Sequence, residues 1–155
     1  MALVGEELYS LLIPLREERL IIPRSCVAEV VRYTPTQQAR DDEWLRDTIV
    51  WRDHEVPVIA FEALLGLDLP SVGGRTRVVI FNPISGTAKC PPYGVLAQGF
   101  PQMVRVNSEV VQLDQSYKAA DEAPVICRIT MLSEQALIPD LELLEPRIAE
   151  ALAAV

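Results

Sequence analysis

The chain has 155 residues, half of them hydrophobic, and a formal net charge of −8 at pH 7. This length fits one domain or two closely joined halves. The negative charge argues against general binding to nucleic acid and against docking onto anionic lipid, because both need a basic surface.

The N-terminus and the cysteines indicate where the protein works. Glu6 and Glu7 stand where a secretory signal would need basic residues followed by an apolar run. No apolar stretch approaches the ~20 residues of a membrane-spanning helix. The three cysteines lie far apart and form no C-x-x-C pair. We therefore expect a cytoplasmic protein with free thiols.

Short apolar runs, separated by Pro, Gly, Asn or Asp, dominate the chain. In chain order they are LYSLLIPL, RLIIP, VAEVVRY, DTIVW, EVPVIAF, TRVVIF, YGVLAQ, QMVRVN, EVVQL, VICRITM and ALIP. Such runs predict β-strands, and REER between the first two predicts a hairpin tip. So many short strands leave no room for crossover helices, which favours antiparallel barrels or sandwiches.

Two segments have a helical pattern. In FEALLG, Phe61, Leu64 and Leu65 share one face, and Gly66 follows as a stop. In PRIAEALAAV, Pro146 occupies a favourable first position for a helix, with apolar residues one turn apart behind it. We expect one or two helical turns in the first segment and a short amphipathic helix, lying on the barrels, in the second.

The best internal boundary is GLDLPSVGGRT, residues 66–76, which has no apolar periodicity. It divides the chain into a first subdomain at about 8–66 and a second at about 75–139, followed by a helix at 140–154. Each half then holds about five strands, near the lower limit for an independent core. We expect a single domain, residues 1–155, whose halves share their packing.

Motifs for catalysis or metal binding are weak. His54 is the only histidine and has no cysteine at zinc-ligand spacing, and no glycine-rich phosphate motif is present. Paired carboxylates can hydrolyse glycosides, but adjacent acids in a loop usually face water. We expect no enzyme activity, no metal and no cofactor. The alternative is a small-molecule-binding or hydrolytic barrel that uses Asp41–Glu43 and Asp47.

The segment VWRDHEVPVIAFEALLG places Arg52 close to two acids, Asp47 and Asp53. A guanidinium in such a place can form a structural ion pair or dock a partner protein, and both interpretations fit the sequence. Catalysis by Arg52 is the least favoured of the three, because no other catalytic group is evident nearby.

The order of several segments carries a family resemblance, and residues 27–66 hold its most specific part. Val27, Glu29 and Val30 are followed by a pattern W-L-x-G…R-G…P-V, met by Trp44, Leu45, Arg52, Pro57 and Val58. From Leu8 to Leu144 the chain thereby resembles the CheW family of chemosensory coupling proteins. The ending IAFEALLG is most similar to the branch attached to type IV pilus systems.

The resemblance implies a mostly β fold of two small SH3-like five-stranded β-barrels with short helices. It also implies a non-catalytic adaptor, recruited to receptor arrays at the inner membrane, in chemotaxis or twitching motility. Its partners would be the regulatory domain of a CheA-type histidine kinase and the cytoplasmic tip of a chemoreceptor. The implied kinase contacts are Val27, Glu29, Val30 and Arg52. The implied receptor groove between the barrels lies near Val78, Gly94 and Phe100.

Two positions depart from the family pattern. Asp47 and Asp53 stand where the family usually has glycine. Glycine permits a positive φ or a close approach, whereas aspartate there costs conformational freedom or needs a compensating hydrogen bond. The departures leave open an alternative role, a specialised or competing array member with altered partner binding.

Overall fold

The computed structural model describes residues 7–39, 43–131 and 133–154, and within them it contains eleven β-strands and two α-helices. Each strand overlaps one of the apolar runs, so the prediction of a mostly β fold is confirmed. The strands are β1 (Leu8–Pro14), β2 (Arg19–Pro23), β3 (Val27–Arg32), β4 (Leu45–Trp51), β5 (His54–Ile59), β6 (Arg77–Phe81), β7 (Tyr93–Ala97), β8 (Gln102–Val106), β9 (Val111–Leu113), β10 (Val125–Met131) and β11 (Glu134–Pro139). The helices are α1 (Phe61–Leu64) and α2 (Leu141–Ala153), and a 3-10 turn spans Arg24–Cys26.

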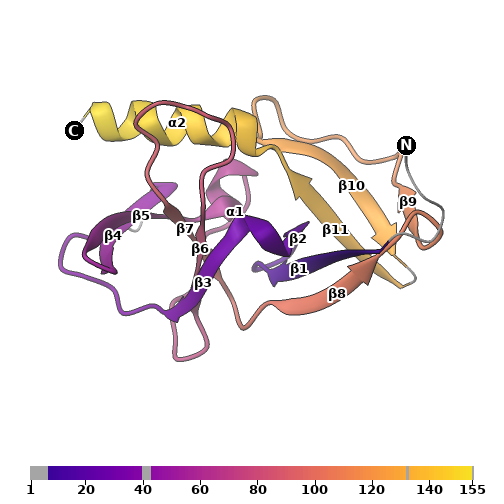
Figure 1. Ribbon diagram of the computed structural model, residues 1–155, viewed down its shortest axis with the longest axis horizontal. Helices are drawn as coiled ribbons and strands as arrows, with labels where there is room; N and C mark the ends of the chain where they lie inside the picture. The colour runs from indigo at the N-terminus through magenta and orange to yellow at the C-terminus, as the bar shows by residue number, and fades with distance from the viewer. Residues whose placement is uncertain (1–6, 40–42, 132, 155) are drawn as a thin grey trace.

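The strands form two sheets (Figure 1). In the described part of the chain, sheet A has six strands in the order β8-β1-β2-β11-β10-β9, and sheet B has five in the order β3-β6-β7-β5-β4. Two of the pairings are parallel, β2 with β11 and β5 with β7. The expected pair of small β units is therefore present, although sheet A is larger by one strand than expected.

The composition of the two sheets differs from the division at residues 66–76 that the sequence predicts. Sheet B takes β3 to β7, whereas β1 and β2 pair with strands from the C-terminal half. Residues 66–76 connect two parts of sheet B and are no boundary between units. The predicted hairpin β1–β2, with REER at its tip, is present. Its other neighbours, β8 and β11, are distant in sequence, so no local pattern could have identified them.

Successive side chains of a central strand enter different cores. Val78 and Ile80 of β6 lie in the core of sheet B, whereas Val79 and Phe81 lie in a core that both sheets share with α2. A third core lies within sheet A. A strand buried on both faces has a continuous apolar sequence rather than an alternating one. This explains why the runs contain so few polar residues.

The two helices form where the sequence predicts them, and α2 lies within the expected range 140–154. Gly66 ends the α1 segment with a φ of +75°, as its role as a stop requires. The side chain of Asp140 caps α2 by accepting a hydrogen bond from the Leu143 amide, at 3.1 Å. Pro146 therefore lies inside α2, on its exposed side, and is not its first residue. Neither helix of the described residues is long and apolar enough to cross a membrane.

Candidate protein-docking site

The side chain of Glu29 on β3 connects the two edge strands of sheet B. Its Oε1 accepts hydrogen bonds from Trp51 Nε1 at 3.2 Å and from Arg52 Nη2 at 3.0 Å. Trp51 ends β4, which lies at the opposite edge of the sheet from β3. The edge strands β3 and β4 are not paired through their backbones, so these side-chain hydrogen bonds are what connects them. We call Glu29, Trp51 and Arg52 the edge cluster.

The hairpin between β4 and β5 turns through Arg52 and Asp53, with Trp51 opposite His54. Both turn residues have positive φ, 49° and 64°. Two-residue turns of this kind match the twist of the strands but favour asparagine and glycine. Position 53 is therefore one at which a glycine would relieve a backbone constraint. His54 is exposed at the start of β5, as its place in a turn predicts.

Arg52 serves as a brace and remains accessible. Its guanidinium lies over the Trp51 ring, 4.8 Å from the centroid, and its side chain is 67% exposed. An exposed ion pair such as Arg52–Glu29 contributes about 0–1 kcal/mol. A guanidinium has five N–H donors, so the bond to Glu29 leaves others for a partner. The structural and the docking interpretations of Arg52 are therefore compatible.

Val27 and Val30 lie on β3 beside Glu29 but are only partly exposed. A bulge between Val27 and Glu29 shifts the alternation of the strand, and both valines pack against the shared core. Val27, Glu29 and Val30 thus lie on one edge strand of sheet B, and Arg52 reaches Glu29 from the turn at the opposite edge. Arg52 is exposed, whereas Glu29 and the two valines are all partly buried.

The three residues expected near a receptor groove fall into two environments. Val78 is fully buried, and a Cβ atom built on Gly94 would lie 2.3 Å from Val78 Cγ1, inside the core of sheet B. Both residues are buried and therefore cannot touch a partner, which corrects the expectation that they line a groove. Phe100, in contrast, is 67% exposed.

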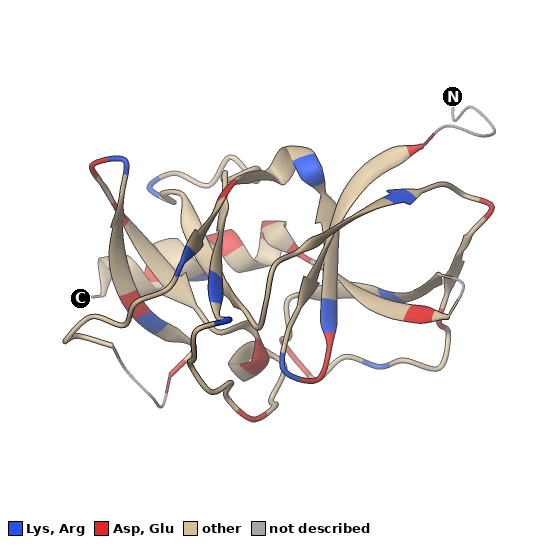
Figure 2. Ribbon diagram, turned by 90° about the horizontal axis from the view of Figure 1, so that it is seen from below, with Lys and Arg blue, Asp and Glu red and all other residues tan. Residues whose placement is uncertain are grey.

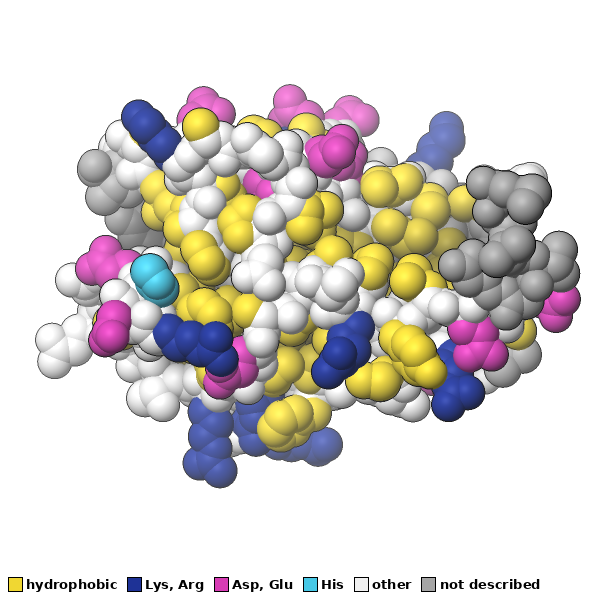
Figure 3. All heavy atoms as spheres, in the orientation of Figure 1, with side chains coloured by type: hydrophobic (Ala, Val, Ile, Leu, Met, Phe, Trp, Pro, Cys, Tyr) yellow, Lys and Arg dark blue, Asp and Glu magenta, His cyan; other side chains and the backbone are white. Residues whose placement is uncertain are grey.

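Two arginine–aromatic pairs, which the sequence interpretation missed, flank β8. Arg77 lies over Phe100 at 4.6 Å, and Arg105 lies over Tyr9 at 5.6 Å. Met103, between them on β8, is also exposed. We call these five residues the β8 surface. Basic side chains gather along the edge of the molecule opposite α2 (Figure 3). The alternation in QMVRV was the available signal for an outward-facing Met103 and Arg105.

Asp47 is buried and fully engaged. Its carboxylate accepts hydrogen bonds from Tyr33 Oη and from the Thr36 amide, both at 3.0 Å, from the Thr48 amide at 2.8 Å, and from the Thr36 hydroxyl. Burial alone would raise the pKa of Asp47, but these bonds outweigh it, so the pKa lies below its usual value. Asp47 meets the need for a compensating hydrogen bond and anchors the segment after β3 to β4.

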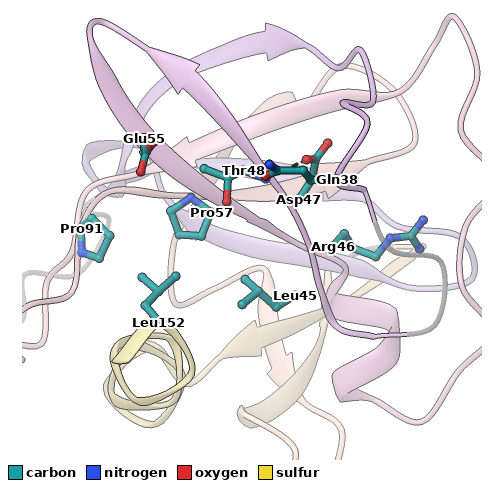
Figure 4. Close-up of a pocket in the computed structure, with 9 residues that line it drawn as sticks. All are labelled: Gln38, Leu45, Arg46, Asp47, Thr48, Glu55, Pro57, Pro91 and Leu152. Carbon is teal, nitrogen blue, oxygen red and sulfur yellow. Dashed lines mark hydrogen bonds between the residues drawn. The ribbon is translucent and has the colours of Figure 1, made fainter. Parts of the chain in front are cut away.

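A cleft of about 630 Å³ lies beside Asp47, between the β4–β5 hairpin and the end of α2 (Figure 4). Asp47 and Glu55 are the two carboxylates that line it. Because Asp47 is already hydrogen-bonded, it is poorly placed to act as an acid or base. Of the other acids in the hydrolytic alternative, Asp41 and Asp42 lie outside the described residues, and Glu43 is not among the lining residues. The lining residues are Gln38, Leu45, Arg46, Asp47, Thr48, Glu55, Pro57, Pro91 and Leu152.

Most charged residues lie at strand ends and in loops (Figure 2), but two buried glutamates do not. Glu145 of α2 accepts hydrogen bonds from the Ser85 amide at 2.8 Å and from Tyr93 Oη at 2.7 Å. Burial, and then this contact with Glu145, raises the pKa of Tyr93. Glu62 of α1 accepts a bond from the Arg16 amide at 2.9 Å, and burial raises its pKa. Both glutamates tie helices to loops.

Comparison with known proteins supports one family. A family model described as the CheW-like domain matches residues 10–147. The crystal structure of the scaffolding protein TtCheW from Thermoanaerobacter tengcongensis is similar, with a TM-score of 0.69 and 16% sequence identity. The alignment covers 87% of this chain and 85% of that one. No significant match was found among curated proteins. At this identity the structural similarity shows the fold alone.

Proposed function

The chain belongs to the CheW-like domain family, and from that premise we propose that it is a non-catalytic adaptor between a chemoreceptor and a CheA-type histidine kinase. The family match covers strands of both sheets, which supports the proposal of a scaffold with two partners. In this role the protein works in the cytoplasm, at receptor arrays of a chemotaxis or twitching-motility system, and takes no part in phosphoryl transfer.

The single observation that carries the proposal is the edge cluster. Arg52 and Glu29, at implied kinase-contact positions, are paired at 3.0 Å and keep 67% and 41% of their side chains exposed. A pre-positioned guanidinium costs less conformational entropy on binding than a free one. We therefore assign the kinase contact to the edge cluster, with Val27 and Val30 giving partly exposed apolar area beside it.

The receptor contact belongs on the β8 surface. Phe100 is the one residue of the implied groove that is exposed, and Arg77 holds its ring from one side. Exposed aromatic and arginine side chains are enriched among residues that dominate protein interfaces. Val78 and Gly94 contribute only by packing inside sheet B.

The alternative of a competing array member depends on Asp53. Asp47 is buried in its own hydrogen-bond network and can affect a partner only indirectly. Asp53 is exposed beside Arg52 and would face the kinase directly. An acid at this position favours a kinase surface with a complementary cation, and it weakens binding to one without.

The test is calorimetric titration of the protein with the regulatory domain of its cognate kinase. Arg52→Ala should weaken binding about tenfold, equivalent to about 1.4 kcal/mol, because it removes a charge at the centre of the contact. The control variant Arg75→Ala removes an exposed arginine outside the edge cluster. It should change the affinity for the kinase domain less than twofold. Absence of binding by the folded wild-type protein would contradict the proposal.

A second measurement separates coupling from competition. Kinase autophosphorylation is followed with receptor present, at increasing concentrations of the protein. An adaptor raises receptor-controlled activity up to stoichiometric amounts, whereas a competing member lowers the activity supported by another coupling protein. The Asp53→Gly variant should move the result towards coupling if the acid restricts the choice of kinase.

A further inference from the structure

A groove on the α2 side of the molecule shares no residue with the edge cluster or the β8 surface. It has a volume of about 600 Å³ and lies between α1, the C-terminal half of α2 and the loop around residues 121–122. Its lining residues are Trp44, Ala63, Leu64, Asp121, Glu122, Arg147, Glu150, Ala151 and Ala154.

The floor of the groove is apolar. Trp44 and Leu64 are partly buried and pack against the shared core, while their remaining surface lines the groove. Ala63 on α1 and Ala151 on α2 have short side chains, which leave space between the two helices. A floor of this kind accommodates aliphatic side chains from another molecule.

The rim of the groove is acidic. Asp121, Glu122 and Glu150 are exposed, and the only cation among the lining residues is Arg147, 3.9 Å from Glu122. Acidic side chains are visible along the edge of the molecule formed by α2 (Figure 3). Three carboxylates against one guanidinium leave the rim negative.

The end of α2 adds to this negative charge independently of the side chains. The carbonyl groups at the C-terminal end of a helix carry partial negative charge, which a lysine or arginine in the last turn normally offsets. The last turn of α2 has no basic residue. Ala154, at this end, lines the groove, so a cation placed there would meet both the rim and the helix terminus.

We propose that this groove docks an amphipathic helix of a partner protein that carries lysine or arginine beside aliphatic side chains. The aliphatic side chains would cover Trp44 and Leu64, and the cations would lie against Glu150 and the end of α2. Phosphate-bearing partners are disfavoured because the rim would repel them. The groove is a third surface of the adaptor, beyond the kinase and receptor contacts proposed above.

The test uses an 18-residue helical peptide with leucines on one face and lysines at its borders, and a matched peptide with glutamate at every lysine position. Affinities are measured by calorimetry at low and at high salt. The lysine peptide should bind, with an affinity that falls at least fivefold at high salt, and the glutamate peptide should not. In the Trp51→Phe protein, where Trp44 is the remaining tryptophan, binding should shift the tryptophan emission.

Charge-reversal variants locate the contact. The double variant Asp121→Lys/Glu150→Lys should weaken binding of the lysine peptide at least tenfold. Glu142→Lys, on an exposed position in the first turn of α2 and outside the groove, should weaken it less than threefold. Equal losses in both variants, unchanged Trp44 emission, or absence of binding would overturn the proposal. Self-association of the protein that depends on Glu150 would also overturn it, in favour of a second copy as occupant.

Discussion

Asp47 and Asp53 lie in the same strand–turn unit, at positions where the family resemblance implies glycine, but their environments are opposite. Asp47 is buried, with its carboxylate saturated by hydrogen bonds from three residues. Asp53 is exposed in a turn with a φ of +64°. The same change in sequence therefore builds a structural anchor at one position and leaves a strained backbone at the other.

The largest effect is expected from Asp47→Ala. The variant removes the carboxylate that accepts hydrogen bonds from the Tyr33 hydroxyl and the Thr36 amide. We expect it to lower the free energy of unfolding by about 3 kcal/mol, because the donor in one buried hydrogen bond and the donors in three part-buried ones lose a charged acceptor. Urea denaturation measures this. Asp53→Ala is the matched control, and a loss at position 53 as large as that at position 47 would contradict the comparison.

A smaller effect, of about 1–2 kcal/mol, is expected from Asp47→Asn, which keeps the shape but removes the charge. The pKa of Asp47 is lowered in the folded protein, so its contribution is complete above the unfolded pKa of about 3.9. This contribution is lost as the pH falls through the folded pKa. The difference in unfolding free energy between wild type and variant should shrink below pH 4. If this difference in unfolding free energy did not depend on pH, the charge of Asp47 would not be the source of the stabilisation.

Replacement by glycine should have opposite signs at the two positions. Asp53→Gly should stabilise the protein by about 1 kcal/mol. Glycine adopts a positive φ without strain, and this gain exceeds the cost of the extra conformational entropy that glycine gives the unfolded chain. Asp47→Gly should destabilise it, since the carboxylate is lost. Thermal unfolding of both variants measures the change in stability at each position. A change of the same sign at both positions would contradict the explanation.

The smallest effect on stability is expected from Arg52→Ala. Its ion pair with Glu29 is exposed, so the coupling free energy should be below about 1 kcal/mol. A double-mutant cycle with Glu29→Ala measures this coupling directly. A coupling well above that value would mean that Arg52 acts mainly as a brace and that its partner-binding role is secondary.

Local patterns predicted the elements well and their assembly poorly. The apolar runs, the REER turn and the stop at Gly66 all depend on neighbours a few residues apart, and all are confirmed. The division near residue 70 was wrong, because β1 and β2 pair with β8 and β11, which come from the C-terminal half of the chain. The C-terminal helix lies within the predicted range 140–154, but Pro146 is not its first residue. The Asp140 cap, which the sequence interpretation overlooked, starts the helix, and Pro146 inside it cannot donate an intrahelical hydrogen bond.

The candidate site was predictable in outline only. The resemblance pointed to Glu29 and Arg52, and the fold brings them together from opposite edges of sheet B. It also pointed to Val78 and Gly94, whose burial on β6 and β7 removes them from any surface. Inward and outward positions cannot be distinguished when both neighbours in the strand are apolar, because both faces of β6 are covered.

The sequence by itself determined the class of fold, since short apolar runs between turn residues leave a chain of this length little choice but small β-sheets. It also determined where the chain turns, because glycine and charged turn residues act locally. Only the tertiary structure decided which strands pair, which of two aspartates is an anchor, and that Glu29 meets Arg52. Those outcomes depend on contacts between residues far apart in the chain, and their geometry exists only once both sheets have closed around the shared core.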